Sequence, residues 1–467
     1  MIVSLRELPE LRGDGEDSRM AKLLAIGDVH LGTRPSSVPQ DAADRGVDVE
    51  RLTPAAGLEA AVRLAIEQEV DAVVFAGDVV ESTNARYEAI RHLEAAVRKL
   101  LAEDIAVLGV VGNHDVEALP RLAGLIPGFR LVGAGGRWER VAVERQGQPV
   151  CEVVGWSFPQ RQVTSSPVAD FAGSSLAPAQ PGVPRIGVMH CDLDASGGPY
   201  APVTTSELAR TGVDTWLLGH IHKPSLDESR ADSPGLRAGY LGSLVGLHPN
   251  EVGDRGPWLV DLANGAARLT HVSNAPLRWE AFDLAVDPDQ QPDDLGDAVL
   301  AAVEQRIRAL HARGVEPSVL GLRVRLTGTT RSYAAIDEWV EHRGWSEITR
   351  TVGATTAFVN KVSNAAELAR DLQELAKGDD PPGLLARKLL TLETAGPERD
   401  ALIARARERL RAVADASNFA PLQDLRDAAD PLADEAIARA LKASGASVLS
   451  ALLGQHDQAA PAEVAER

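Results

Sequence analysis

Short apolar runs alternate with helical patterns through the first half of the chain. The runs "KLLAIGD", "DAVVFAGD" and "IAVLGVVGNHD" are typical of buried strands, and each ends in a glycine beside polar residues. Between them, "AAGLEAAVRLAIEQE" and "YEAIRHLEAAVRKLLAED" have the apolar spacing of amphipathic helices. This succession predicts βαβ units over residues 21–275, in an α/β fold whose parallel or mixed sheet has helices outside it.

The pattern changes after about residue 275. Residues 276–392 combine strand-like stretches such as "LRWEAFDLAV", "VLGLRVRLTG" and "TTAFVNKV" with predicted helices over 295–313 and 333–343, which indicates a smaller α/β domain. From residue 393 the stretch "ERDALIARARERLRAVADA" is typical of amphipathic helices, and a polar, frayed tail is predicted after Leu453. Residues 1–20 show no clear period and are predicted to be a disordered extension.

Composition narrows the class of protein. A length of 467 residues with 44% hydrophobic content suffices for two or three domains with a core. The two cysteines, Cys151 and Cys191, are too few for a disulfide framework, and Cys191 is expected to be a small buried hydrophobe. Neither a signal peptide nor a run of about 18 apolar residues is found, which predicts a cytoplasmic protein outside the membrane.

The formal charge of −19 argues against a broadly basic nucleic-acid surface. Affinity for a phosphate backbone comes largely from Lys and Arg side chains that displace counterions. Any nucleic-acid site on this chain must therefore be local.

Five polar clusters each follow a strand candidate: "GDVHLG", "GDVVE", "GNHD", "MHCD" and "GHIH". They hold five of the eleven histidines, a concentration that ordinary loop polarity does not explain. Ligands of open α/β sheets lie beyond the carboxyl ends of the strands, so these clusters should share one rim. The candidate metal ligands are Asp28, His30, Asp78, Asn113, His190, His220 and His222.

These residue types suit two divalent cations that clamp a phosphoester. Such a pair needs a bridging carboxylate and a mixture of oxygen and nitrogen ligands. Carboxylates, an amide oxygen and imidazoles favour Mn²⁺, Fe or Zn²⁺ over Ca²⁺, and the lack of cysteine ligands argues against a structural zinc site.

In this order, the motifs D-x-H, G-D, G-N-H-D, H and G-H-x-H resemble the calcineurin-like metallophosphoesterase superfamily. The stretches "YLGSLVGLHPNEVGDRGPWLVDL" and "APLRWE" further resemble the SbcD-like DNA-repair exonucleases, especially their YhaO-type branch. The motifs extend from Asp28 to Glu280. The resemblance implies a four-layer α/β/β/α core with a capping domain, and a hydroxide nucleophile activated by two metals. Mn²⁺ is the expected activator, with Fe, Zn²⁺ and Mg²⁺ as alternatives.

The resemblance also implies a role for each residue. One metal would be held by Asp28, His30 and His222, the other by Asn113, His190 and His220, with Asp78 bridging them. His114 would stabilise the phosphate or protonate the leaving oxygen, and Asp115 would orient its ring. One position departs from the family, because Glu81 stands where several members have histidine or aspartate. Glu81 is either a solvated carboxylate or a support for the site.

Other polar residues of the rim carry weaker signals. The candidate phosphate contacts are Arg34, Arg86, Lys223 and Arg255, and simple solvation is the alternative for each. His248 is expected in a surface turn before Pro249. The remaining histidines, His92, His271, His311, His342 and His456, carry no motif and are expected at the surface or in packing.

The resulting hypothesis is a phosphodiesterase that acts on DNA in repair, as an exonuclease or endonuclease. The resemblance implies an SMC-like (SbcC-type) coiled-coil ATPase as partner, docked through the helical region 393–467, and a possible homodimer. One alternative is a phosphoesterase for small nucleotides or phosphoproteins. Another is an assembly subunit that binds DNA ends and the ATPase with weak catalysis. DNA as substrate rests on resemblance and conflicts with the acidic total.

Overall fold

The computed structural model describes residues 21–39, 42–44, 46–81, 87–172, 176, 180–195, 197–213, 215–228, 235–263, 266–343, 345, 347–369, 371–414 and 432–459. The predicted N-terminal extension lies outside these residues. The chain divides into two compact units. The first holds the described residues of Met1–Glu280 with Arg306–Leu322 and Thr349–Asn360, and the second holds those of Ala281–Gln305, Arg323–Ile348 and Lys361–Arg467.

The first sheet of the first unit has the strand order β11-β10-β1-β2-β3-β4. Its strands are β1 (Ala21–Ile26), β2 (Ala72–Phe75), β3 (Ala106–Gly109), β4 (Phe129–Leu131), β10 (Trp258–Ala263) and β11 (Ala266–His271). β1 to β4 run parallel, whereas β10 is antiparallel to β1 and β11 to β10. The parallel part is built from the predicted βαβ units, so the carboxyl ends of β1, β2 and β3 meet at one edge.

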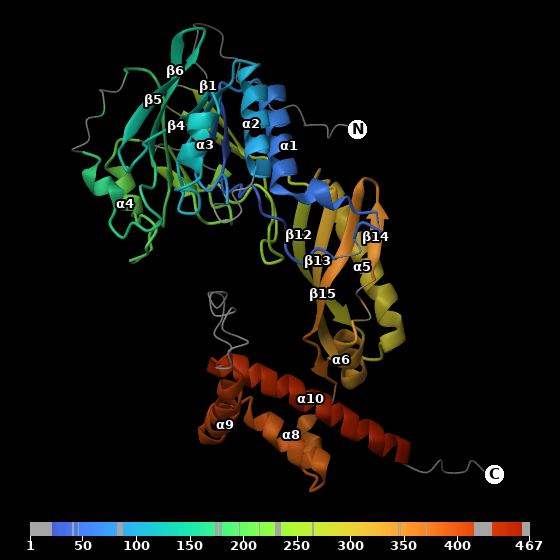
Figure 1. Cartoon of the computed structure of the whole chain (residues 1–467). Coiled ribbons are helices and arrows are strands. Elements are labelled where there is room, and N and C mark those ends of the chain that lie inside the picture. Colours follow the sequence, from blue (N-terminus) through green and yellow to red (C-terminus); the bar gives the residue numbers. More distant parts are fainter. Residues whose placement is uncertain are drawn as a thin grey trace, which may run out of the picture. The chain divides into compact units, whose positions relative to one another are not determined.

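Helices α1 (Pro54–Glu67) and α2 (Tyr87–Leu101) lie side by side along this sheet (Figure 1). The hydroxyl of Thr53 accepts the N–H of Ala56 at 3.4 Å and so caps α1, and Pro54 fits its first position because no N–H is needed there. The shorter helices of this unit are η1 (Val49–Leu52) and α3 (Leu119–Leu125).

The second sheet of the first unit has the order β5-β6-β7-β8-β9. Its strands are β5 (Glu139–Arg145), β6 (Gln148–Trp156), β7 (Arg185–His190), β8 (Thr215–Gly219) and β9 (Arg237–Tyr240). β6 to β9 run parallel, and β5 is antiparallel to β6. The short helices η3 (Pro167–Asp170) and α4 (Thr205–Ala209) place Val168 and Leu208 in the same apolar cluster as Trp216 of β8.

Alternate side chains of the strands fill two different cores, because successive residues of a strand point to opposite faces. Leu24 and Ile26 of β1 join the cluster that contains α1 and α2, whereas Leu23 and Ala25 join a second cluster. That second cluster also contains Leu217 of β8, so the two sheets pack face to face. Because both faces of these strands are buried, their sequences are continuous apolar runs.

A third sheet has the order β12-β13-β15-β14, and β16 also pairs with β13. Its strands are β12 (Leu277–Val286), β13 (Val319–Thr330), β14 (Thr349–Val352), β15 (Thr355–Asn364) and β16 (Glu367–Leu368). The helices of this region are η5 (Pro292–Asp294), α5 (Leu295–His311) and α6 (Tyr333–Glu341). Both longer helices begin at the predicted residue and end two residues before the predicted end.

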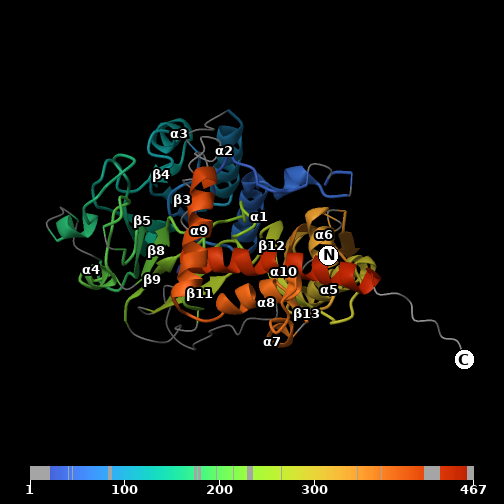
Figure 2. The same cartoon turned by 90° about the horizontal axis from the view of Figure 1, so that it is seen from below.

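The second unit ends in helices α7 (Leu372–Leu375), α8 (Pro381–Thr391), α9 (Pro397–Ala414) and α10 (Asp434–Ala459). α8 and α10 lie side by side in both views (Figure 1, Figure 2). Ile403 of α9 packs with Ile437 and Ala438 of α10 in a small apolar cluster. The prediction of a core, an additional sheet and C-terminal helices in an α/β chain is therefore confirmed. The domain boundaries at 275/276 and 392/393 stay predictions.

α10 differs from the sequence-based expectation in two respects. It continues through Ala459, past the Leu453 at which the polar tail was expected to begin. Its segment Asp434–Leu453, with a mean hydropathy of 1.3, is also long and apolar enough to cross a membrane by length and composition alone. Helices of water-soluble proteins also meet these criteria of length and composition. The sequence predicted no membrane span because it lacks a continuous run of apolar residues.

Candidate metal centre

The candidate ligands lie at the carboxyl ends of parallel strands from both sheets of the first unit. Asp28, Asp78 and Asn113 follow β1, β2 and β3, His190 ends β7, and the "GHIH" segment follows β8. The backbone N–H groups of Val29 and His30 both donate to the Asp78 carbonyl, at 3.0 and 2.9 Å, and so join the first two loops. The clusters thus lie together at one rim in the structure, as the sequence predicted.

Several of these residues occupy backbone conformations that L-amino acids rarely adopt. Asp78 has φ 48°, His30 has φ 52° and His220 has φ 110°. Such conformations persist only where surrounding contacts hold them, and they concentrate at functional sites. Gly219 permits a close approach of two strands, because a Cβ there would lie 2.1 Å from the Ala76 carbonyl oxygen. Gly219 therefore allows the backbones of the two sheets to pack closely beside the centre.

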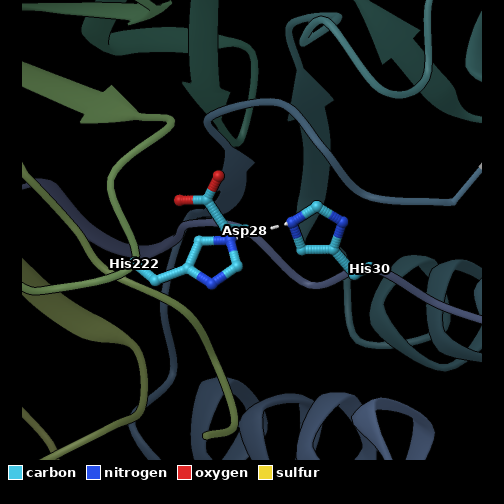
Figure 3. Close-up of side chains that lie close together, drawn as sticks. All are labelled: Asp28, His30 and His222. Atoms are coloured by element: carbon cyan, nitrogen blue, oxygen red, sulfur yellow. Dashed lines mark hydrogen bonds between the residues drawn. The ribbon is translucent and has the colours of Figure 1, made fainter. Parts of the chain in front are cut away.

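The first ligand group consists of Asp28, His30 and His222 (Figure 3). One ligand atom from each lies within 4.8 Å of the others. The Nε2 atoms of His30 and His222 face each other at 3.1 Å. Asp28 is only 1% exposed, and its carboxylate accepts the backbone N–H of His220 at 3.0 Å. Two ring nitrogens and a buried carboxylate that converge in this way suit a cation between them.

The second ligand group contains Asp28, Asp78 and His190, again with ligand atoms within 4.8 Å of one another. His190 Nε2 lies 2.9 Å from Asn113 Oδ1 and 3.4 Å from Asp78 Oδ2. Asp78 Oδ2 also lies 3.9 Å from His30 Nε2, so this carboxylate stands between the two groups. That position is consistent with the bridging role that the resemblance implied.

His220 adjoins the second group. Its ring centroid lies 5.2 Å from that of His190, in an edge-on arrangement. Its Nε2 atom is 3.0 Å from Asp192 Oδ1, which leaves Nδ1 as the nitrogen available to a cation. Burial and the neighbouring His190 lower the pKa of His220, which favours the neutral form that can bind metal.

Each of the three histidines from the second sheet is held at the ring nitrogen that the metal would not use. His190 Nδ1 is 3.1 Å from the Ala76 carbonyl oxygen. His222 Nδ1 lies 2.8 Å from Glu251 Oε1. His220 Nε2 lies 3.0 Å from Asp192 Oδ1. Partners of this kind fix the tautomer and orientation of a metal-binding imidazole.

Glu251 is itself firmly placed. Its Oε2 accepts the backbone N–H of Leu247 at 2.9 Å and the hydroxyl of Ser243 at 3.3 Å. Burial favours the neutral carboxyl, but the hydrogen bond and charge of His222 outweigh it and lower the pKa of Glu251. The residue roles assigned from the sequence included neither Glu251 nor Asp192, although Glu251 stands inside the quoted stretch "YLGSLVGLHPNEVGDRGPWLVDL" and Asp192 inside "MHCD".

Glu81, not Asp115, holds the ring of His114. Glu81 Oε2 accepts the Nδ1–H of His114 at 3.1 Å. Asp115 points inward instead, where its carboxylate accepts the backbone N–H groups of Gly112 at 2.7 Å and Val79 at 2.8 Å. The expected orienting role of Asp115 is therefore corrected: its carboxylate ties the loop after β3 to the loop after β2.

The charges of the centre favour a protonated His114 and an ionised Asp78. The hydrogen bond that His114 donates to Glu81, with the charges of Asp78 and Glu81, raises the pKa of His114 to about 9 despite partial burial. Burial alone would raise the pKa of Asp78, but the nearby His190, His30 and His114 outweigh it and lower that pKa. Asp78 thus stays a carboxylate that can serve as a metal ligand.

The donor set fits two divalent cations. It supplies buried carboxylates, an amide oxygen and imidazoles, each with a partner that orients it, and contains no thiolate. Residues that hold a divalent metal in this way are typical of dimetal phosphoesterases. The donor types suit several metals, so the choice of metal is not fixed by them.

The remaining predicted residues do not belong to the ligand groups. The exposed Arg34 forms an ion pair with Glu50 at 2.8 Å, and Lys223 is exposed. Arg255 is buried, and Arg86 lies outside the described residues. His248 is exposed in a turn in which its Nδ1 accepts the N–H of Asn250 at 3.1 Å, as expected. Cys191 is fully buried, also as expected.

Comparison with known proteins agrees with the geometry. Residues 21–224 match the family model of the calcineurin-like phosphoesterases. The chain is 26% identical over 302 residues to the uncharacterized metallophosphoesterase YhaO of Bacillus subtilis. The aligned region covers 59% of this chain and 66% of that protein. It is 28% identical over 265 residues to the DNA double-strand break repair protein Mre11 of Aeropyrum pernix, covering 54% of this chain and 61% of the relative.

A further relative is the Mre11 of Halobacterium salinarum, at 26% identity over 367 residues, 78% of this chain and 81% of the relative. The chain spans slightly less than two thirds of the first two relatives. The homology to YhaO and to archaeal Mre11 proteins is therefore distant.

Proposed function

We propose that this chain, whose residues 21–224 form a calcineurin-like metallophosphoesterase domain, is a metal-dependent phosphodiesterase that cleaves DNA. The observation that carries the proposal is the single rim at which two carboxylates, an amide oxygen and four imidazoles converge. DNA is favoured over other phosphodiesters because relatives named as DNA double-strand break repair proteins match 54 to 79% of the chain. We also propose that the core has the four-layer α/β/β/α arrangement, with short helices as its fourth layer.

Two divalent cations, when bound, lower the pKa of water and stabilise charge on the phosphate oxygens. Their ligands would be Asp28, His30 and His222 for one, Asn113, His190 and His220 for the other, and Asp78 for both. Mn²⁺ is our preferred cation. Asp192 and Glu251 would keep the two histidines of "GHIH" aimed inward throughout the reaction.

His114 is placed to donate a proton to the leaving oxygen. Its side chain is 48% exposed, so a substrate can reach it, and Glu81 holds its Nδ1. Nε2 is then the nitrogen that faces the substrate. The hydrogen bond to Glu81 raises the pKa of His114 and so favours the protonated ring that this role requires.

A coiled-coil ATPase of the SMC type is the proposed partner, docked on the C-terminal helices of a cytoplasmic protein. Each of α8, α9 and α10 exposes one large apolar side chain, namely Leu384, Leu410 and Val448. Amphipathic helices of this kind can dock on the groove or coiled coil of a partner. A homodimer, as in the family, is part of the same proposal.

A phosphoesterase for small nucleotides or phosphoproteins is the second candidate, favoured by the net charge of −19. An assembly subunit with weak catalysis is the third. To separate them, the metal-stripped chain is resupplied with Mn²⁺ and incubated with end-labelled linear DNA and with bis- and mono-p-nitrophenyl phosphate, alone and with a candidate ATPase.

Each reaction is run beside the variant His114→Leu, which should keep its metals and lose most hydrolysis. Cleavage of DNA and of the diester by the wild type alone supports the nuclease. If the small esters are cut while DNA survives with the ATPase present, the second candidate holds. Binding of DNA ends without turnover of any ester supports the assembly subunit.

A further inference from the structure

A cavity of about 500 Å³ in the first unit is lined by an excess of arginines. It lies between α1, the β11–β12 connection and the segment 315–318. Its charged lining residues are Arg51, Arg63, Arg255, Arg278, Glu59 and Glu316. Four arginines against two glutamates form a local positive site on a chain whose formal charge is −19.

Arg255 is the unusual member of this lining. Its side chain is 4% exposed, and its buried Nε has no hydrogen-bond partner. Nη1 donates to the neighbouring Asp254 carbonyl at 2.7 Å, and no ion pair links Arg255 to a carboxylate in the part of the chain that the structure describes. A buried guanidinium without a carboxylate in direct contact is costly, and burial lowers the pKa of Arg255 although the charges of Glu251 and Asp254 oppose this shift.

The other arginines of the cavity already have carboxylate partners. Arg278 pairs with Asp254 and with Glu280, whereas Arg63 lies 3.7 Å from Glu59 on the same helix. The cavity therefore holds one buried cation that has no ion pair among the described residues and whose Nε–H has no acceptor. An oxyanion would supply both a counter-charge in direct contact and an acceptor for Nε–H.

The cavity is close to the metal centre along the chain. Arg255 and Glu251, the partner of His222, are separated by four residues, which span at most about 14 Å. The charge of Arg255 also contributes to the lowered pKa of Glu251, so the two side chains interact. A polymer whose scissile phosphate lies at the metal centre could present a neighbouring phosphate to the cavity.

We propose that this cavity binds a phosphate group, with Arg255 as its buried donor. The source of this phosphate rests on the proposed function: it belongs to the DNA strand, a few nucleotides from the bond that is cleaved. Free inorganic phosphate has the same chemistry, and the experiment separates the two sources.

The test is the binding of a fluorescein-labelled DNA duplex to the metal-free full chain, measured by anisotropy between about 50 and 200 mM salt. Arg255→Gln is expected to raise the Kd about tenfold. It should also reduce the slope of log Kd against log salt by about 0.9, the value for one lost phosphate contact. Wild-type affinity and slope in a folded Arg255→Gln would overturn the proposal.

Arg325→Gln is the matched control, since Arg325 is exposed and pairs with Asp283 in the second unit. It should bind DNA like the wild type. If Arg255→Gln melts below the wild type, Arg63→Gln takes its place, because the Arg63 side chain is 60% exposed on α1 and tolerates change. Arg63→Gln should raise the Kd about threefold, and an unchanged salt slope in this variant would equally count against the cavity.

A wild type that cuts bis-p-nitrophenyl phosphate but neither binds nor cuts DNA contradicts the proposed function and leaves the cavity to be tested with inorganic phosphate. Phosphate should then raise the Tm of the metal-free wild type more than that of Arg255→Gln. Equal shifts in the two proteins would overturn the cavity proposal as well.

Discussion

The Glu81 carboxylate lies 3.1 Å from Nδ1 of His114 and 3.5 Å from Nδ1 of His30, both through Oε2. One side chain thus supports the proposed proton donor and a candidate metal ligand together. Glu81, for which the sequence left a solvated carboxylate or a support for the site as alternatives, is therefore a support for the site. The pKa of Glu81 is lowered because its hydrogen bonds to His114 and His30 outweigh its burial.

Glu81→Gln should move the alkaline limb of activity to lower pH. His114 must keep its proton in order to donate it, and the Glu81 hydrogen bond keeps its pKa at about 9. Without that carboxylate the pKa returns toward the ordinary value of about 6.5, so the proton is lost at lower pH. The measurement is kcat against pH with a dinucleotide, whose leaving oxygen needs a proton. An unmoved alkaline limb, at unchanged metal content, would exclude this role.

The sequence was sufficient to predict the order of strands and helices from β1 to β3 and the residues that gather at the rim. Asp28, Asp78, Asn113 and His220 each follow a glycine directly at the end of an apolar run, and His30, His190 and His222 stand in the same clusters, so local pattern and strand direction place them. The supporting contacts could not be predicted in this way. Glu81 and His114 are 33 residues apart, and Glu251 and His222 are 29 apart, so only the folded backbone brings them together. Asp115 was misassigned because adjacency to His114 says nothing about which way its side chain turns.

Glu251→Gln and Asp192→Asn should each weaken metal binding about 10- to 100-fold. Both variants keep the size of the side chain but remove the charge that orients His222 or His220. Isothermal titration with Mn²⁺ gives the dissociation constants. The control is Glu338→Gln, since Glu338 is an exposed glutamate of α6 beside the exposed His342, which follows that helix. Mn²⁺ affinity within twofold of the wild type in both site variants would show that these carboxylates do not position the ligands.

Stability should fall as the pH is lowered through the window below about 6.5, in part because of His271. Burial lowers the pKa of this histidine, which packs on Trp258 with ring centroids 4.8 Å apart. The unfolded chain therefore binds a proton that the folded chain does not, and the free energy of unfolding decreases by at most about 1.4 kcal/mol per pH unit from this group.

Urea unfolding at pH 7 and at pH 5.5 checks this. His271→Phe should show a smaller difference between the two pH values than the wild type, whereas His342→Phe at an exposed position should not change it. An equal pH dependence in wild type and His271→Phe would remove His271 from the account.

The two cysteines should be inert in the folded protein. Both are fully buried, and burial raises the pKa of Cys151 to about 12 and that of Cys191 further. Because the thiolate is the reactive form, a thiol reagent at pH 8 should label neither residue until urea unfolds the chain. Labelling of the native protein at the rate of a free thiol would contradict the burial of these side chains.

The most direct test of the two-metal centre is the metal content of the purified chain together with its turnover of bis-p-nitrophenyl phosphate. The wild type should bind two Mn²⁺ per chain and hydrolyse the diester, as should the control Asp283→Ala at an exposed position of the second unit. Asp78→Ala should bind fewer cations and show no metal-dependent turnover, because it removes the carboxylate that stands between His30 and His190. Full turnover by Asp78→Ala, or a wild type that binds a single cation, would contradict the centre described here.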